Sequence, residues 1–247
     1  MMRKILIVIP ARYKSSRFLG KPLKKILGRE LVLRVADRCK KISNKSDLII
    51  ATDNSSISKV AKKESFKVIM TSQNCLTGTD RVAEVAKKIN SKIYINVQGD
   101  EPLVNPRDIK KIIYQKIKYP KHVICGFSKI SNFENPASKN IPKIVMNKNN
   151  ELVYISRALV PSSKKKSKIQ FNKQVCIYAF NKMELAKFSS MKKKSALEKL
   201  EDIEILRFFD LGIKIKMVKL SSKTLAVDIK SDIKKVEKFL KNEKKIY

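Results

Sequence analysis

Residues 4–12 read KILIVIPAR, an unbroken apolar run that ends in proline, alanine and arginine. A short apolar run without polar alternation is typical of a strand that is buried on both faces of a sheet. Similar runs follow at residues 47–51, 66–70 and 92–97. Segments with helical spacing lie between these runs, at residues 31–41, 55–64 and 79–89. Alternating strands and helices predict an α/β fold whose mostly parallel sheet is covered by helices on both faces.

The second half of the chain has a less regular pattern. It predicts a helix that ends at residue 119, strands at 122–127, 174–180 and 213–218, a hairpin that pairs 143–146 with 152–155, a long helix at 196–211 and a last helix at 232–240. The polar, lysine-rich residues 157–173 predict a mobile loop. No repeat or linker separates two domains, so we expect one domain over residues 1–247.

The composition excludes several classes of protein. The longest uncharged apolar stretch is too short to cross a bilayer, and the four cysteines are dispersed, which predicts a cytoplasmic protein without membrane insertion. The net charge of +34 is mostly lysine, with ten arginines, and no basic stripe alternates with aromatic residues. We therefore expect the lysine runs to be solvated surface and expect no nucleic-acid partner, although a basic nucleic-acid-binding protein remains the alternative of a different class.

The loop after the first predicted strand gathers cations at the carboxyl end of the sheet. Arg12, Arg17 and Lys21 surround Ser15 and Ser16 there. Backbone amides and hydroxyls can wrap a polyphosphate, and the cations can stabilise the charge that builds up on a phosphorus under attack. The loop has neither the Walker nor the dinucleotide-binding glycine spacing. An ordinary basic surface loop is the alternative.

Acids follow two other apolar runs. The fourth run ends in NVQGDEP at residues 96–102, and Asp228 ends the short run 225–227. Mg²⁺ takes one or two carboxylates together with phosphate oxygens and water, so Asp100 and Asp228 are the predicted metal ligands. A turn or a helix cap is the alternative for each acid.

Residues 77–81 read TGTDR, a turn that leads into a helix whose N-terminus could meet a phosphate or a base edge. A simple capping box is the alternative, but it does not explain the glycine or the arginine. His122, the only histidine, has no acid or cysteine neighbour in sequence, and we interpret it as structural.

Taken together, these segments resemble the bacterial CMP-Kdo synthetases, the 3-deoxy-manno-octulosonate cytidylyltransferase family. The matching stretches are IPAR at 9–12, GKPL at 20–23, GTDR at 78–81, NVQGDEP at 96–102, SRA at 156–158 and VD at 227–228. The resemblance implies a Rossmann-like sheet of the nucleotide-diphospho-sugar transferase type, a homodimer and a need for Mg²⁺. It also implies a nucleotide-binding part at about 1–130 and 212–247 and an inserted sugar-binding and dimerisation part at about 131–211.

The resemblance also implies roles for individual residues. Arg12, Lys21 and Asp100 would be catalytic, and Asp100 and Asp228 would hold Mg²⁺. The nucleotide would bind to Pro10, Ala11, Arg12, Lys21, Gly78, Thr79 and Arg81. The sugar would bind to Gln98, Arg157, Gln174, Tyr178 and Glu204. In the implied reaction the C2 hydroxyl of Kdo attacks the α-phosphorus of CTP and pyrophosphate departs.

The departures from the family pattern fall mainly on the sugar side. Gln174 stands where the family usually has histidine, and Ile205 stands where a glutamine commonly follows the glutamate. After Asp228 the Thr-Pro turn of the family is replaced by Ile229-Lys230. A cytidylyltransferase for a related acidic sugar, such as 8-amino-Kdo or a nonulosonate, is therefore the nearest alternative.

Overall fold

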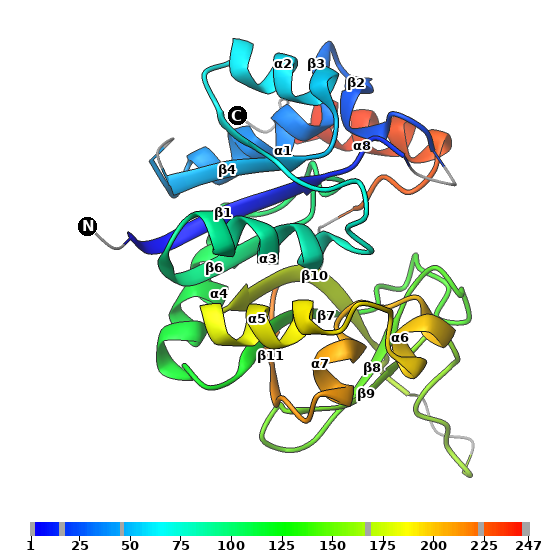
Figure 1. The fold of residues 1–247 in the computed structure, drawn as a ribbon. Coiled ribbons are helices and arrows are strands. Elements are labelled where there is room, and N and C mark those ends of the chain that lie inside the picture. Colours follow the sequence, from blue (N-terminus) through cyan, green and yellow to red (C-terminus); the bar gives the residue numbers. More distant parts are fainter. Residues whose placement is uncertain (1–2, 15–17, 45–46, 166–168, 222–224, 244–247) are drawn as a thin grey trace.

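The computed structural model describes residues 3–14, 18–44, 47–165, 169–221 and 225–243. Its main sheet runs in the order β11-β7-β10-β6-β1-β4-β5, and the hairpin β8–β9 attaches to β10 (Figure 1). The strands of the N-terminal half are β1 (Arg3–Ala11), β4 (Leu48–Thr52), β5 (Lys67–Met70) and β6 (Ser91–Val97). They are parallel to one another, which confirms the prediction from the four apolar runs.

Two helical layers bury the two faces of this sheet. Along β1, Leu6 and Val8 pack into one hydrophobic cluster, and Ile7 and Ile9 pack into the other. The first cluster takes in α3 (Gly78–Lys88) and α5 (Lys182–Ser190), and the second takes in α1 (Leu31–Lys40), α2 (Ser55–Lys63) and α4 (Pro106–Lys118). Both faces of β1 are therefore apolar because both are covered.

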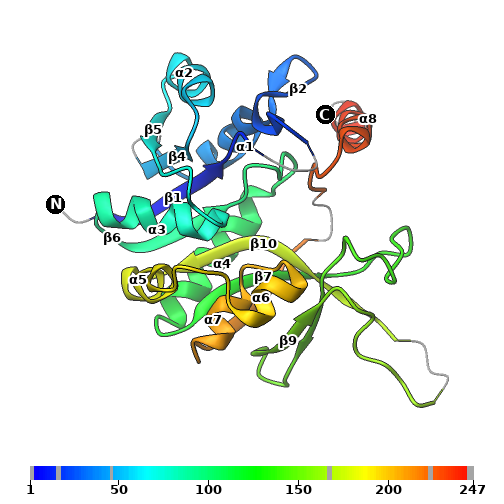
Figure 2. The ribbon, with the colours of Figure 1, turned by 45° about the vertical axis from the view of Figure 1, so that its right-hand side comes forward.

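β10 (Asn172–Phe180) breaks the parallel pattern in the middle of the sheet. It runs antiparallel to β6 on one side and to β7 (Val123–Lys129) on the other, with a bulge between Val175 and Tyr178. β11 (Ile215–Lys219) completes this edge, parallel to β7. Figure 2 shows β10 crossing the molecule between the β1 and β7 sides. A strand from the region predicted as an insertion is thus part of the main sheet.

The predicted hairpin is present. β8 (Lys143–Met146) pairs with β9 (Leu152–Ser156), and its turn contacts the edge strand, since the amide of Met217 donates to the carbonyl of Asn150 at 2.7 Å. In the described part of residues 157–173, helices and strands are absent until β10 begins at Asn172.

The predicted long helix at 196–211 is wrong. The structure has two short helices, α6 (Ala196–Glu201) and α7 (Leu206–Asp210), separated by a turn in which Asp202 has φ 50°. The left-handed conformation, which aspartate tolerates better than most residues, ends the helical hydrogen bonding. The turn buries Ile203 and Ile205 in the core and leaves Glu204 to face a cavity.

The remaining elements were not all predicted. A 3₁₀ helix (Lys21–Leu23) and a two-stranded ribbon, β2 (Lys25–Ile26) with β3 (Arg29–Glu30), follow the first loop, and α8 (Lys230–Glu243) begins two residues before the predicted helix. Helix α5 was missed, although Asn181 and Glu184 form its capping box. Within the described ranges, no helix has the length and apolar character needed to cross a membrane.

Candidate active site

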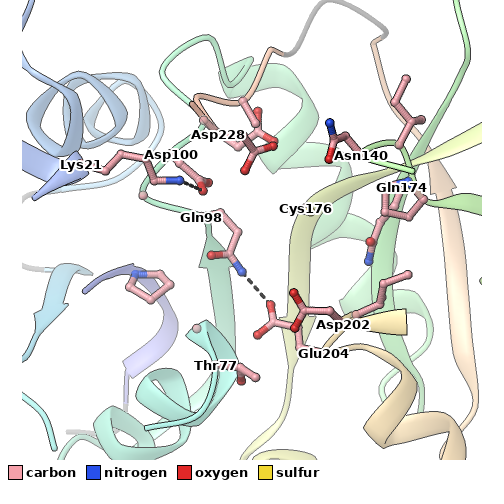
Figure 3. Close-up of a pocket in the computed structure, with 18 of the residues that line it drawn as sticks. Lys21, Thr77, Gln98, Asp100, Asn140, Gln174, Cys176, Asp202, Glu204 and Asp228 are labelled. Atoms are coloured by element: carbon pink, nitrogen blue, oxygen red, sulfur yellow. Dashed lines mark hydrogen bonds and ion pairs between the residues drawn. The ribbon is translucent and has the colours of Figure 1, made fainter. Parts of the chain in front are cut away.

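A cavity of about 840 Å³ opens where β1 and β6 end, and it extends to β10 and the α6–α7 turn. Every binding residue that the sequence predicted lines it, except Thr79. Figure 3 shows Lys21, Asp100 and Asp228 on one side of this space and Gln174, Asp202 and Glu204 on the other. The proposed nucleotide and sugar residues therefore share one pocket.

Lys21 joins three distant segments of the chain. Its Nζ lies 2.7 Å from Oδ2 of Asp100 and 2.8 Å from the carbonyl oxygen of Val227, and the amide of Val227 donates to the carbonyl of Asp100. The side chain thus ties the first loop to the end of β6 and to the segment that carries Asp228. The hydroxyls of Ser15 and Ser16 and the guanidinium of Arg17 lie outside the described residues.

The acids at this end suit a magnesium ion that also binds phosphate. Asp100 and Asp228 line the same cavity, and a lysine ammonium already compensates the charge of Asp100. Among the described residues no group of three or more histidine, cysteine or acidic side chains forms a closed metal cage. Two carboxylates with room for phosphate oxygens and water match the way in which Mg²⁺ binds nucleotides, so these residues fit the ion.

Two glycines allow the elements around the nucleotide side to approach closely. A Cβ atom at Gly99 would lie 2.7 Å from the carbonyl oxygen of Pro10. A Cβ atom at Gly78 would lie 3.0 Å from the amide group of Gln98 and 3.2 Å from Cγ of Pro10. The ends of β1 and β6 and the start of α3 therefore meet at a spacing that a larger residue would widen.

The side chain of Glu204, from the α6–α7 turn, binds at the N-terminus of α3. One carboxylate oxygen accepts a hydrogen bond from the backbone amide of Thr79 at 2.9 Å. The other accepts a hydrogen bond from Nε2 of Gln98 at 2.6 Å (Figure 3). A helix N-terminus favours negative charge, although burial raises the pKa of Glu204 above its ordinary value. Thr79 thus contributes its backbone to the site rather than a cavity-lining side chain.

Arg81 lies in the wall of the cavity and is 2% exposed. Its guanidinium donates to Asp53 at 2.6 Å and to Oγ1 of Thr71 at 2.6 Å, while Asp53 also accepts the amide of Tyr13. The sequence did not single out Asp53, although it directly follows β4 at the same edge of the sheet as Asp100. A contact between Arg81 and the nucleotide stays a prediction.

On the sugar side, backbone carbonyls hold Arg157. Its guanidinium donates to the carbonyls of Glu201 at 2.5 Å, Lys139 at 2.7 Å and Asp202 at 3.1 Å. These bonds connect the α6–α7 turn to the loop before β8. Nε2 of Gln174 lies 3.1 Å from the hydroxyl of Tyr178, whose pKa is raised by burial.

Seven further cavity residues carry charge and received no role from the sequence: Glu101, Glu134, Lys173, Lys194, Asp202, Asp232 and Lys235. Lys173 forms an ion pair with Glu134, and both line the cavity. Glu101 is 6% exposed, and its Oε2 has no hydrogen-bond partner among the described residues. Burial raises the pKa of Glu101 to about 8, with the negative charge of Asp100 adding to the increase. In the sequence, the position of Glu101 inside NVQGDEP was the signal that could have identified it as a site residue.

The only histidine lies outside this site. Nε2 of His122 is 3.4 Å from Oε1 of Glu151, and its ring packs edge-on against Tyr119. None of these three residues lines the cavity.

The fold and the cavity define a nucleotidyltransferase, and a family model described as cytidylyltransferase matches residues 6–215. The chain is 32% identical to 3-deoxy-manno-octulosonate cytidylyltransferase of Escherichia coli over 98% of both sequences. It is 34% identical to the protein of the same name from Protochlamydia amoebophila, over 97% of this chain and 95% of the relative. The chain belongs to the 3-deoxy-manno-octulosonate cytidylyltransferase family.

A solved structure supports the same assignment. CMP:2-keto-3-deoxy-manno-octonic acid synthetase complexed with CTP superimposes with a TM-score of 0.89 at 33% identity, covering 97% of this chain and 99% of that chain. A 4-diphosphocytidyl-2C-methyl-D-erythritol synthase from Anaerococcus prevotii shares the fold at a TM-score of 0.62 and 14% identity. The predicted family and the predicted nucleotide-diphospho-sugar transferase fold are both confirmed.

Proposed function

We propose that this chain transfers CMP from CTP to the C2 hydroxyl of 3-deoxy-D-manno-octulosonate, giving CMP-Kdo and pyrophosphate for lipopolysaccharide synthesis. The observation that carries the proposal is the meeting of Lys21, Asp100 and Asp228 in the same cavity as Arg157 and Glu204. The relative that superimposes with a TM-score of 0.89 is complexed with CTP.

The side chains of this protein would act by positioning and by neutralising charge. Arg12 and Lys21 would bind the triphosphate of CTP and stabilise the departing pyrophosphate. Gln98 and Glu204, already fixed by their mutual hydrogen bond, would orient the sugar so that its C2 hydroxyl lies in line with the α-phosphorus. A preorganised pocket lowers the entropic cost of bringing the two substrates together.

Asp100 and Asp228 would hold Mg²⁺. When bound, the ion would neutralise phosphate oxygens and add electrostatic stabilisation as charge develops at the phosphorus. Lys21 would then redistribute its contact between Asp100 and the phosphates, since one ammonium has three donors.

The identity of the sugar depends on the β10 side of the cavity. Gln174 presents a neutral amide there, and its Nε2 bonds to Tyr178. A neutral amide suits sugar hydroxyls, so Kdo fits, and 8-amino-Kdo and nonulosonates are the alternatives that the sugar side leaves open.

The decisive experiment measures pyrophosphate release by the purified chain with CTP and Mg²⁺ against a panel of Kdo, 8-amino-Kdo and nonulosonates. We expect turnover with Kdo and a CMP-sugar product of the corresponding mass. Turnover with another sugar acid and none with Kdo would refute the substrate assignment. No turnover with any sugar acid, together with tight salt-sensitive DNA binding, would favour the nucleic-acid-binding alternative.

The proposal includes a homodimer formed through the region at about 131–211. Large apolar side chains of this region reach the solvent in the single chain, among them Phe133, Val153 and Leu200. Apolar surface of this kind is common where subunits meet. Light scattering that gives twice the chain mass of 28.3 kDa would support the dimer, and the mass of one chain at micromolar concentration would exclude it.

A further inference from the structure

Three side chains in the described part of the chain carry a buried polar atom without a hydrogen-bond partner: Asn96, Glu101 and Ser128. Glu101 differs from the other two because it lines the cavity. A buried polar group that lacks a partner costs about 1–3 kcal/mol, and more when it is charged. A carboxyl group kept in this position beside a substrate pocket calls for a ligand that completes its hydrogen bonding.

The charges around Glu101 indicate where it lies in the cavity. Asp100, Asp228, Lys173 and Lys21 all act on it electrostatically. Lys21 pairs with Asp100 and Lys173 pairs with Glu134, and Oε2 of Glu101 has no hydrogen-bond partner among the described residues. Glu101 directly follows Asp100 of the nucleotide side in sequence, and it lines the same cavity as Lys173 of β10.

The chemistry of the two substrates indicates which of them can hydrogen-bond to Glu101. Phosphate oxygens offer no hydrogen-bond donor to the unpartnered carboxyl oxygen of Glu101. Among the described residues, no three acidic, histidine or cysteine side chains are grouped so that they could hold a metal ion, so Glu101 does not form a metal cage with Asp100 and Asp228. A polyhydroxy acid, by contrast, brings several hydroxyl donors to the β10 side of the pocket.

We propose that Glu101 is a specificity-determining residue that hydrogen-bonds a hydroxyl group of the acceptor sugar. This inference rests on the proposed function, because it requires a polyhydroxy acid in the cavity. Backbone hydrogen bonds fix the main chain at Glu101 before the sugar arrives, since the amide of Glu101 donates to the carbonyl of Gln98 and the amide of Val104 donates to the carbonyl of Glu101. A preformed acceptor discriminates strongly against sugars that lack the matching hydroxyl.

The test combines the variant Glu101→Leu with analogues of the accepted sugar that each lack one hydroxyl. We expect Glu101→Leu to raise KM for the sugar at least tenfold and to leave KM for CTP within twofold. With the native protein, kcat/KM should be about tenfold lower for one deoxy analogue than for the accepted sugar. With Glu101→Leu, the same analogue and the accepted sugar should give equal kcat/KM, because the carboxyl group that bonds the hydroxyl is absent. The proposal would be overturned if Glu101→Leu raised only the KM for CTP. It would also be overturned if, for every deoxy analogue, the loss in kcat/KM from the missing hydroxyl added in full to the loss from the variant.

Ser128→Ala is the matched control, because it removes a buried unpartnered atom that lies outside the cavity. It should leave both KM values unchanged, and an equal rise in KM for the sugar would contradict a specific role for Glu101. If Glu101→Leu does not fold, Glu101→Gln carries the test. The neutral amide keeps the shape and should raise KM for the sugar about threefold or more, whereas an unchanged KM would overturn the inference.

The two proposals fail in different ways. Absence of turnover by the native protein with every sugar acid refutes the proposed function. Turnover by the native protein, with a Glu101→Leu variant that keeps its discrimination among the deoxy analogues, refutes only the role of Glu101.

Discussion

At the scale of single residues, the carboxylate of Asp100 carries the largest expected effect. Asp100→Asn removes the charge that the proposed magnesium ion requires while keeping the side-chain shape, so we expect pyrophosphate release to fall by about 10²-fold or more. Asp37→Asn is a suitable control, since Asp37 pairs with Arg29 away from the cavity. Equal activity of the Asp100→Asn variant and the native protein would contradict the assigned role.

Gly99 tests the spacing between the ends of β1 and β6. Gly99→Ala places a methyl group 2.7 Å from the carbonyl oxygen of Pro10, so the strand ends must separate. We expect a loss of about 1–3 kcal/mol in the free energy of unfolding and a rise in KM for CTP. Chemical denaturation and kinetics measure the two effects.

Gly28→Ala separates this steric effect from backbone strain. Gly28 has φ 79° with open space around it, so alanine there costs about 1–2 kcal/mol by conformation alone. The variant should unfold at lower denaturant concentration but keep its KM for CTP. A changed KM would show that the Gly99 effect is not specific to the site.

At the scale of elements, Arg207 connects the N-terminal caps of α6 and α3. Its guanidinium bonds to Glu198, which belongs to the capping box of α6, and to Asp80, which belongs to the capping box of α3. It also stacks on the ring of Phe188 with 3.8 Å between Cζ and the ring centroid. This link fixes the α6–α7 turn, and therefore Glu204, against the N-terminus of α3.

Arg207→Met should therefore be strongly destabilising. It leaves the fully buried Glu198 without its partner, which costs about 3–5 kcal/mol, and it should raise KM for the sugar because Glu204 loses its support. Arg29→Met, which breaks partly exposed pairs with Asp37 and Glu64, should cost about 1 kcal/mol or less per pair. Similar losses in the two variants, measured by urea denaturation, would contradict the structural role of Arg207.

The sequence predicted most elements because period and apolar runs are local properties. It missed the break between α6 and α7, since the spacing of apolar residues at 196–211 fits one helix. The turn at Asp202 is stabilised by the packing of Ile203 and Ile205 into the core, which the spacing does not show. It identified Asp100 for a reason that holds in the structure, since the loop after β6 lies at the edge of the sheet where parallel strands end, whereas Asp228 lines the same cavity from a segment without a strand. It passed over Asp53 and Glu101 although both stand in loops that follow strands, because only the packed chain shows that Asp53 pairs with Arg81 and that Glu101 lacks a partner in the described part of the chain.

At the scale of the whole molecule, the charge of +34 is not concentrated at the site, because seven cationic and seven acidic residues line the cavity. Cavity cations such as Lys21 and Lys173 are paired with acids, whereas Lys164 and Lys165 are exposed and lie outside the cavity. Replacing Lys164 and Lys165 with glutamine should leave kcat/KM within about twofold at 0.15 M salt, where exposed charges are screened. A large loss of turnover would show that this lysine run contacts a substrate.

The position of β10 also has a consequence for how the chain acquires its structure. β1, β4, β5 and β6 come from the first hundred residues and pair with one another, but β7 and β11 join them only through β10. During synthesis, β7 can therefore join the strands of the first half only after residues 172–180 have left the ribosome. The strand that carries Gln174 and Tyr178 thus joins the two parts of the sheet, and the pocket is complete only after Glu204 and Asp228, which follow it in the chain, have also been made.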